Sequence, residues 1–169
     1  MYATVQELVD ALTLEEKVGQ LFIVRPDALD LSLSQETIND AKADGVTTVT
    51  NDMRRALQQY PVGGICQFGK NIESPSQLAR FNKELQDASA TPLFITVDEE
   101  GGLIARLANS DAFTLPRYAS AAAVGASGDP DDARAMGQTI GAYLKEYGFT
   151  MDFAPDADVN TNPDNPIIG

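Results

Sequence analysis

The sequence predicts an α/β fold with a mainly parallel sheet built from about four βα units. Short apolar runs, typical of buried strands, alternate with segments whose apolar residues recur at helical spacing. Polar loops, GKN, DEEGG and DADVNTNPDN, follow the apolar runs on their carboxyl side. Ligands of parallel α/β folds bind at that end of the strands, so we expect the functional site there.

The first sixty residues predict three helices and one strand. Thr13 and Glu16 have the spacing of a capping box, so a helix should begin after Thr13. The apolar run 21–24 predicts a short strand, ended by an Arg-Pro pair. The polar stretch 34–59 favours helix, but a glycine and a β-branched run at 45–49 should divide it in two.

The middle of the chain predicts two buried strands with an amphipathic helix between them. The run VGGICQF at 62–68 is apolar and contains two glycines, which indicates a buried strand whose backbone is closely approached. Ser74-Pro75 should begin the helix. Its apolar face consists of Leu78, Phe81, Leu85 and Ala88. The second strand, 93–97, runs directly into the acidic loop DEEGG.

The last part of the chain predicts one long helix, one strand and a polar loop. Asp129 and Pro130 are typical of an N-cap and a first helical position, and Gly148 of a residue just past the helix end. The predicted apolar stripe consists of Ala133, Met136, Ile140, Leu144 and Tyr147. A strand at 149–154 and a loop at 155–169 follow.

These four units amount to the N-terminal half of a (β/α)8 TIM-type barrel. A complete barrel of eight units typically needs about 250 residues, whereas this chain has 169. We therefore interpret residues 1–169 as one partial barrel domain. Its open parallel edges would be a liability, so we expect self-association through them.

Composition excludes several classes of function. With 12 Lys and Arg against 25 Asp and Glu, the net charge of −13 disfavours binding to nucleic acid. No histidine is present, which removes Ser-His-Asp and Cys-His catalysis. The one cysteine, Cys66, precludes an intrachain disulfide. We expect no metal and no cofactor. The sequence also has no apolar run of the roughly 18 residues of a membrane span and no signal peptide at its start.

Four blocks, in the same order and at similar spacing over most of the chain, resemble the N-terminal barrel of family 3 glycoside hydrolases, most closely its bacterial β-N-acetylhexosaminidase branch. The blocks are LTLEEKVGQLF, GGICQFGKNIESPSQLARFNKELQDASATPLFITVDEEGGLIARL, LPRYASAAAVGA and FTMDFAPDADVNTNPDNPIIG. The resemblance implies a retaining, exo-acting glycosidase that releases terminal β-linked N-acetylglucosamine. The nucleophilic Asp and the acid/base His of this branch would lie beyond Gly169, so we expect no catalytic residue in this chain, which alone should be inactive.

Asp98 and Arg106 are the residues that the resemblance assigns to substrate. Asp98 matches the family aspartate that accepts hydrogen bonds from sugar hydroxyls, and Arg106 matches an arginine eight residues later. An ionised carboxylate held by a guanidinium suits this role. The alternative is a structural ion pair that braces a loop. Leu103 departs from the family pattern, which commonly has arginine there, and this weakens inference about outer subsites.

The neighbouring Glu99 and Glu100 raise the question of a catalytic carboxylate pair. In an extended strand these two face opposite sides, whereas Asp98 and Glu100 share a face about 6.6 Å apart, at about 3.3 Å per residue. That separation suits a glycosidase pair. We prefer the alternative that Glu100 supports the loop.

Four further residues or motifs are interpreted as structural. The DADVN segment at 156–160 imitates the opening of a calcium loop, but its sixth position is threonine and its twelfth isoleucine. Its Asx side chains should cap turns, and Asp152 should likewise be structural. Cys66 is predicted to be a small core residue, and Lys70 a solvated or salt-bridged loop residue.

Two alternatives to the hexosaminidase remain at this point. One is a β-glucosidase-like member of the same family, and the other is a non-catalytic carbohydrate-binding half-barrel module. The compartment is open: an acidic chain without disulfides suits the cytoplasm, whereas the resemblance favours an exported or cell-surface protein.

Overall fold

A computed structural model describes residues 4–162, 164, 165 and 167. Its main sheet has four parallel strands, β1 (Ile23–Val24), β2 (Gly64–Cys66), β3 (Phe94–Val97) and β6 (Met151–Asp152), in the order β1-β2-β3-β6. The prediction of an α/β fold with about four βα units and mainly parallel strands is confirmed. The strands are shorter than the apolar runs that predicted them, because the ends of those runs continue as turns and loops outside the ladder.

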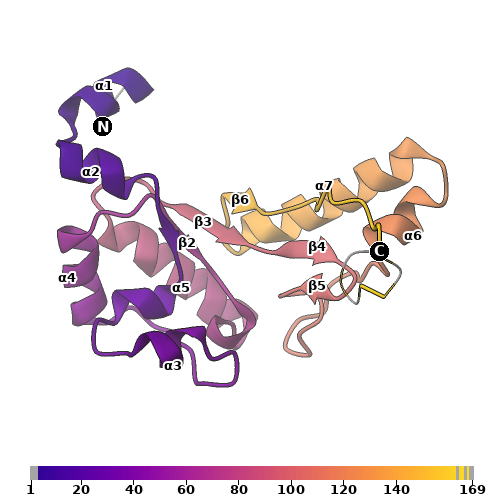
Figure 1. Cartoon of the computed structure of the whole chain (residues 1–169), viewed down its shortest axis with the longest axis horizontal. Helices are drawn as coiled ribbons and strands as arrows, with labels where there is room; N and C mark the ends of the chain where they lie inside the picture. The colour runs from indigo at the N-terminus through magenta and orange to yellow at the C-terminus, as the bar shows by residue number, and fades with distance from the viewer. Residues whose placement is uncertain (1–3, 163, 166, 168–169) are drawn as a thin grey trace.

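The N-terminal third contains several short helices and a 3-10 turn (Figure 1). They are α1 (Val5–Ala11), α2 (Leu14–Gly19), the 3-10 turn η1 (Pro26–Leu29), α3 (Gln35–Asn39) and α4 (Asn51–Gln59). The capping box of α2 is confirmed: the Thr13 hydroxyl accepts from the Glu16 amide over 3.2 Å, and the Glu16 carboxylate accepts from the Thr13 amide over 2.8 Å. The predicted division of 34–59 into two helices is also confirmed.

Two longer helices, α5 (Pro75–Ala88) and α7 (Pro130–Glu146), cover one face of the sheet (Figure 1). Leu78, Phe81 and Leu85 of α5 are buried, as the sequence predicted. In α7, Ile140 and Leu144 are buried while Met136 and Tyr147 are partly buried, but Ala133 is exposed. These side chains share one core with the outward-facing strand residues, which include Ile65, Ile95 and Val97.

The ends of α7 follow the sequence prediction closely. The Asp129 carboxylate accepts from the amide of Asp131 over 2.9 Å, with Pro130 as the first helical residue. Beyond the C-cap at Tyr147, Gly148 has φ of +84°. Only glycine adopts this left-handed backbone without strain, so the helix ends there and the chain turns into β6.

The acidic loop after β3 forms a hairpin that the sequence analysis did not anticipate. Strand β4 (Glu99–Gly101) pairs antiparallel with β5 (Ile104–Ala105). Gly101 and Gly102 in the turn have φ of +87° and +59°, which side chains disfavour. A further 3-10 turn, η2 (Gly69–Asn71), follows β2, and a short helix, α6 (Ala121–Gly125), precedes α7.

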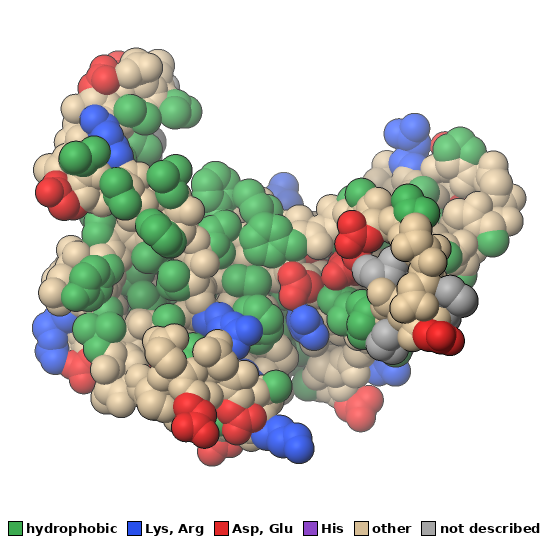
Figure 2. All heavy atoms as spheres, in the orientation of Figure 1, with side chains coloured by type: hydrophobic (Ala, Val, Ile, Leu, Met, Phe, Trp, Pro, Cys, Tyr) green, Lys and Arg blue, Asp and Glu red, His purple; other side chains and the backbone are tan. Residues whose placement is uncertain are grey.

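The opposite face of the sheet is open. Ile23, Gly64 and Phe94 stand in one row across β1, β2 and β3, and the side chains of Ile23 and Phe94 are exposed. Figure 2 shows hydrophobic side chains gathered along this hollowed side, between the arm of α1 and α2 and the arm of α6 and α7. A closed barrel buries this face, so the structure has the shape expected of half a barrel.

Most of the terminal loop predicted at 155–169 is described and contains no helix or strand. Asx turns shape it: the side chains of Asp156, Asn160, Asn162 and Asn165 each accept from the amide two residues later, over 2.8, 3.2, 3.1 and 2.9 Å. Pro163, Pro166, Ile168 and Gly169 lie outside the described residues.

Candidate functional site

The candidate site lies at the carboxyl ends of three neighbouring parallel strands. Arg25 follows β1, Phe68 lies two residues after the end of β2, and Asp98 follows β3 directly. Because the strands are parallel and adjacent in the order β1-β2-β3, their carboxyl ends bring these side chains to one edge of the sheet. This is the edge at which the sequence predicted polar, ligand-binding loops.

Asp98 and Arg106 form an ion pair at this edge, with 3.1 Å between Asp98 Oδ2 and Arg106 Nη2. Their side chains are 23% and 29% exposed, so both remain open to a ligand while being partly desolvated. Partial burial strengthens the attraction relative to a fully exposed pair. The hairpin β4–β5 makes the pair possible, because it returns the chain antiparallel and places Arg106 back beside Asp98.

Two guanidinium groups lie near one aromatic ring beside this ion pair. The guanidinium carbon of Arg25 is 4.3 Å from the centre of the Phe68 ring, and that of Arg106 is 5.7 Å from the same centre. Both distances fall within the range of cation–π attraction. Phe68 therefore joins the end of β1 to the end of the hairpin and gives the site an apolar surface next to its charges.

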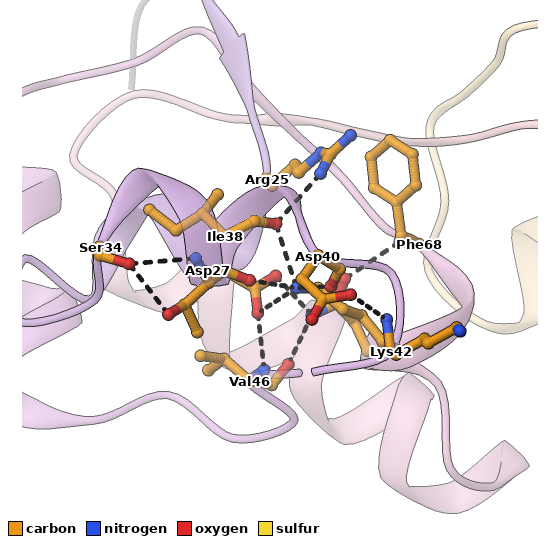
Figure 3. Close-up of polar contacts among 11 residues, drawn as sticks. Arg25, Asp27, Ser34, Ile38, Asp40, Lys42, Val46 and Phe68 are labelled. Carbon is orange, nitrogen blue, oxygen red and sulfur yellow. Dashed lines mark hydrogen bonds and ion pairs between the residues drawn. The ribbon is translucent and has the colours of Figure 1, made fainter. Parts of the chain in front are cut away.

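Arg25 and Phe68 are held in turn by a buried polar network, part of which Figure 3 draws. Asp27 is fully buried; its carboxylate accepts from the Val46 amide over 3.1 Å and from the Asn71 side chain over 2.9 Å. Asn71 also accepts from the Phe68 amide over 3.1 Å. The Arg25 guanidinium donates to the Ile38 carbonyl over 3.1 Å (Figure 3).

Lys70 completes this network. Its ammonium lies 3.5 Å from Asp27 Oδ1, and their side chains are 9% and 1% exposed. It also donates to three carbonyl oxygens, those of Thr37, Ile38 and Asp40, over 3.3, 3.1 and 3.2 Å. Of the two predicted alternatives, a solvated or a salt-bridged residue, the structure shows the salt bridge, and the end of α3 with the residue after it covers the ammonium.

Glu99, not Glu100, carries out the loop-supporting role that the sequence analysis gave to Glu100. Glu99 is fully buried and accepts hydrogen bonds from the amides of Leu107 and Ala108, each over 2.8 Å. Strand alternation explains the exchange: Glu99 faces the core beneath the hairpin, while its neighbours Asp98 and Glu100 face the other side. Glu100 borders the cavity described next.

A cavity of about 430 Å³ lies between the hairpin, the start of α6 and the terminal loop. Its polar lining includes Glu100, Asp156, Asp158 and Asn160. Partial burial and the charges of Asp156 and Asp98 raise the pKa of Glu100 above its ordinary value. The cavity is therefore acidic, and the residues that line it do not include Asp98 or Arg106.

Asp152 at the end of β6 is structural, as predicted. Its Oδ1 accepts from the backbone amide of Glu99 over 3.0 Å. Burial, together with the neighbouring carboxylates, raises its pKa to about 6, although the hydrogen bond from Glu99 acts in the opposite direction.

Cys66 is likewise a buried residue of β2, as predicted, and burial raises the pKa of its thiol. A thiol in this environment is not an activated nucleophile. Across residues 4–162, 164, 165 and 167, no three His, Cys, Asp or Glu side chains are grouped so that they could hold a metal ion. Within the same residues, no helix is both long and apolar enough to cross a membrane.

Comparison with protein families identifies the fold. The model of the glycosyl hydrolase family 3 N terminal domain matches residues 13–169. The chain belongs to this family.

Curated relatives of this family 3 chain carry the name β-hexosaminidase. "Beta-hexosaminidase A" of Pseudoalteromonas piscicida is 31% identical over 140 residues, which cover 80% of this chain and 23% of the relative. "Beta-hexosaminidase" of Thiobacillus denitrificans is 35% identical over 119 residues, which cover 68% of this chain and 32% of the relative. The chain thus spans a third or less of the length of these relatives.

Solved structures agree. A family 3 β-N-acetylglucosaminidase from Paenibacillus sp. matches with a TM-score of 0.73 and 35% identity, over 94% of this chain and 27% of that one. A β-N-acetylhexosaminidase from Beutenbergia cavernae matches with a TM-score of 0.62 and 26% identity, over 85% of this chain and 38% of that one. The prediction of a family 3 barrel of the hexosaminidase branch is confirmed.

Asp98 and Arg106 were proposed from the sequence as substrate residues of this family 3 domain, but three residues that lie beside or support this pair were not identified. Arg25, Phe68 and Glu99 act through contacts with residues distant in the chain or across a hairpin. Of these three, only Glu99 could have been inferred from the sequence. In an extended segment Asp98-Glu99-Glu100 the middle residue faces away from its two neighbours, so it faces the core when Asp98 faces the site. Nothing in the local sequence around Asp27 indicates its partnership with Asn71, 44 residues later.

Proposed function

We propose that the protein containing this chain is an O-glycosyl hydrolase of the retaining, exo-acting β-N-acetylhexosaminidase type, which releases terminal β-linked N-acetylglucosamine. The observation that carries this proposal is the match to a solved family 3 β-N-acetylglucosaminidase at 35% identity over 94% of the chain. Curated relatives named β-hexosaminidase support it. Residues 1–169 would form part of the N-terminal barrel domain of that enzyme.

Within this enzyme, Asp98 and Arg106 would bind the sugar. Arg106 holds Oδ2 of Asp98, and among the described residues nothing donates to Oδ1. A carboxylate fixed by a guanidinium at one oxygen presents its other oxygen to hydroxyl donors, and such charge-assisted hydrogen bonds are strong and directional. The Phe68 ring beside the pair offers an apolar surface to the C–H face of a pyranose ring.

The chain alone would bind sugar without hydrolysing it. By the family resemblance, the nucleophile and the acid/base would lie beyond Gly169, and the sequence of this chain contains no histidine. Binding by this half of the site would be weak, because only one wall of the site is present.

The test compares binding and turnover. Titration of the 169-residue chain with N-acetylglucosamine, followed by NMR, should show saturable chemical-shift changes. Asp98→Asn should raise the dissociation constant obtained from them on the order of tenfold. Asp111→Asn is the matched control, because Asp111 is an exposed carboxyl whose partner Arg117 lies 3.5 Å away on the surface. The full-length enzyme should cleave a chromogenic β-N-acetylglucosaminide in preference to a β-glucoside.

Several results would contradict the proposal. A full-length protein that cleaved only the β-glucoside would assign it to the glucosidase branch, and one that bound sugar without turnover would favour the binding module. Turnover by the 169-residue chain that disappears in Asp98→Ala would show that the chain holds its own catalytic carboxylates.

We also propose that the 169-residue chain on its own self-associates through the open side of its sheet. The edge strands β1 and β6 run parallel and each has one unpaired edge. A two-fold axis along the barrel would place β6 of one copy beside β1 of the other, twice, and so close a ring of eight parallel strands. The apolar inner row, which includes Phe94 at 51% exposure, would then be buried.

Sedimentation velocity over a range of concentrations tests this association. We expect a dimer that Phe94→Asp converts to monomer, while Tyr60→Ser, at an exposed aromatic beyond α4, leaves it unchanged. Since each copy carries a net charge of −13, added salt should strengthen the dimer by screening repulsion. A monodisperse monomer at every concentration and salt would show that only the rest of the barrel covers this face.

A further inference from the structure

Glu99 is a buried carboxylate whose oxygens are both used. Oε2 accepts from the amide of Leu107, and Oε1 accepts from the amide of Ala108 and from the hydroxyl of Tyr143, over 2.8, 2.8 and 2.9 Å. The side chain is fully buried, between the hairpin and helix α7. A buried charge persists only where hydrogen bonds compensate its lost hydration, and these three donors supply them.

The donors of Glu99 lie immediately beside Arg106 in the chain. Leu107 and Ala108 are the next two residues, so fixing their amides fixes the direction in which the backbone leaves Arg106. On the other side, Ala105 is the strand partner of Glu99 in the β4–β5 pairing. Arg106 is thus held on both sides by contacts to a single residue.

Asp98 and Glu99 divide the task between them. As neighbours in extended backbone they point to opposite sides, Asp98 toward the mouth of the site and Glu99 toward the core. Asp98 takes the side chain of Arg106, and Glu99 takes the backbone that follows it. Two adjacent hydrogen bonds therefore link the two sides of the hairpin: one from the Arg106 side chain to Asp98, and one from the Leu107 amide to Glu99.

We propose that Glu99 is a positioning residue of the sugar site, which sets the backbone of Arg106 so that its guanidinium meets Asp98. Arg106 itself supports this assignment. Its Nε is buried and, within the described part of the chain, has no hydrogen-bond partner. The guanidinium is therefore oriented by Asp98, by the Phe68 ring and by the placement of its own backbone.

A small shift of that backbone would strongly disturb the contact between Arg106 and Asp98, because among the described residues no hydrogen bond at Nε holds the guanidinium in place. The pair has a single contact of 3.1 Å between Nη2 and Oδ2, and hydrogen bonds weaken steeply when their geometry is lost. Tyr143 of α7 and Asp152 of β6 extend the support to the core, since they contact the carboxylate and the amide of Glu99.

The test measures hydrogen exchange by NMR in the 169-residue chain, at the amides of Leu107 and Ala108 and at Nε–H of Arg106. The Arg106 resonance is assigned by its loss in Arg106→Lys. Glu99→Gln keeps the shape of the side chain but sets an NH2 group against an amide donor. We expect this variant to accelerate exchange at all three positions by at least about tenfold. One amide loses its acceptor, and the backbone that carries Leu107, Ala108 and Arg106 is then held less firmly. Asp87→Asn, a carboxyl-to-amide change on the exposed surface of α5, where Asp87 pairs with Lys83, should leave all three unchanged.

Faster exchange at Leu107 and Ala108 with an unchanged Arg106 resonance would overturn the proposal and make Glu99 a purely structural residue. Should Glu99→Gln fail to fold, Tyr143→Phe replaces it, because this variant removes one donor and leaves both amide bonds. It should accelerate exchange at all three positions to a smaller extent. No change at Arg106 in this variant would also overturn the proposal.

The claim that Glu99 affects sugar binding rests on the proposed function and is tested by a separate binding measurement. If Glu99 acts through Arg106, Glu99→Gln should weaken N-acetylglucosamine binding, and the double variant with Arg106→Ala should bind no more weakly than Arg106→Ala alone. Additive losses would overturn the positioning role. Failure of the unaltered chain to bind sugar would count against the proposed function, while the exchange measurements would still decide the role of Glu99.

Discussion

Asp152 accepts a hydrogen bond from the backbone amide of Glu99 over 3.0 Å, and this contact joins the end of β6 to the start of β4 beneath the candidate site. The two residues are 53 positions apart in the chain. Asp152 thereby holds the start of the hairpin that brings Arg106 back beside Asp98. Because the carboxyl group is partly buried among other carboxylates, the contact has a pH dependence.

We predict that Asp152→Asn stabilises the chain near pH 7 and has little effect near pH 4. The pKa of Asp152 is raised to about 6 in the folded protein, against about 3.9 in an unfolded chain, so its charged form destabilises the fold. The folded state binds more protons between these values, and stability is therefore lost as the pH rises from about 4 through 6. Asparagine removes this loss and keeps the acceptor for Glu99.

Urea unfolding at pH 4 and pH 7 measures the difference. A two-unit pKa shift corresponds to about 2.7 kcal/mol, and solvent screening of this half-buried carboxyl reduces the expected gain of the variant at pH 7 to about 2 kcal/mol. An equal effect of the substitution at both pH values would show that Asp152 does not titrate in this range.

Lys70→Met should destabilise the fold by about 3–5 kcal/mol, the cost of breaking a buried ion pair. Lys70 lies 3.5 Å from the fully buried Asp27, and methionine would leave that carboxylate without its cation. Lys83→Met is the matched control, since Lys83 pairs with Asp87 on the exposed surface of α5, and should cost less than about 1 kcal/mol. Thermal unfolding compares the two, and equal losses would contradict the role of Lys70.

Tyr143 should remain un-ionised in the folded protein well above the ordinary pKa of tyrosine. Burial raises its pKa first, and the neighbouring Glu99 carboxylate raises it further. Above about pH 10 the unfolded chain loses this proton while the folded chain keeps it, so stability falls as the pH rises. Tyr143→Phe should flatten this alkaline loss, which denaturant unfolding at pH 9 and pH 11 would reveal. A loss as steep as in the unaltered chain would contradict the prediction.

The parts of this fold that local chemistry determines could be predicted from the sequence. The helix α7 was predicted because its cap, its proline and its terminal glycine are adjacent to the stripe they enclose. Asp98 was placed at the carboxyl end of a strand because it follows an apolar run directly, and in parallel sheets ligands bind at that end. These two placements needed only neighbouring residues and a known periodicity, whereas the assignment of Asp98 to substrate came from the family resemblance.

The supporting contacts could not be predicted, because each depends on a distance set by the whole fold. Asp27 meets Asn71 only after β1 and β2 have paired, and Glu99 meets Tyr143 only after α7 has packed on the sheet. The hairpin β4–β5 was missed for another reason: DEEGG is acidic and rich in glycine, which is typical of loops rather than strands.

Alanine substitutions at two glycines should have opposite effects on stability. A Cβ at Gly64 of β2 would lie 2.5 Å from the carbonyl oxygen of Phe94 and 2.9 Å from its Cβ, so Gly64→Ala must separate β2 from β3. Gly137, in the exposed middle of α7, has no atom within 4 Å of the equivalent position. Gly137→Ala should therefore stabilise the chain by about 0.5–1 kcal/mol through helix propensity, whereas Gly64→Ala should destabilise it by at least about 2 kcal/mol.

Urea unfolding of both variants measures these free energies. N-acetylglucosamine binding shows whether the separation of β2 from β3 also alters the candidate site. Because Cys66 of β2 lies two residues beyond Gly64 and pairs with Thr96, just before Asp98, separation of the strands would displace the floor of the site. Gly64→Ala should thus weaken both folding and binding, and Gly137→Ala neither. A stable Gly64→Ala variant would mean that β2 and β3 are less closely paired than the structure shows.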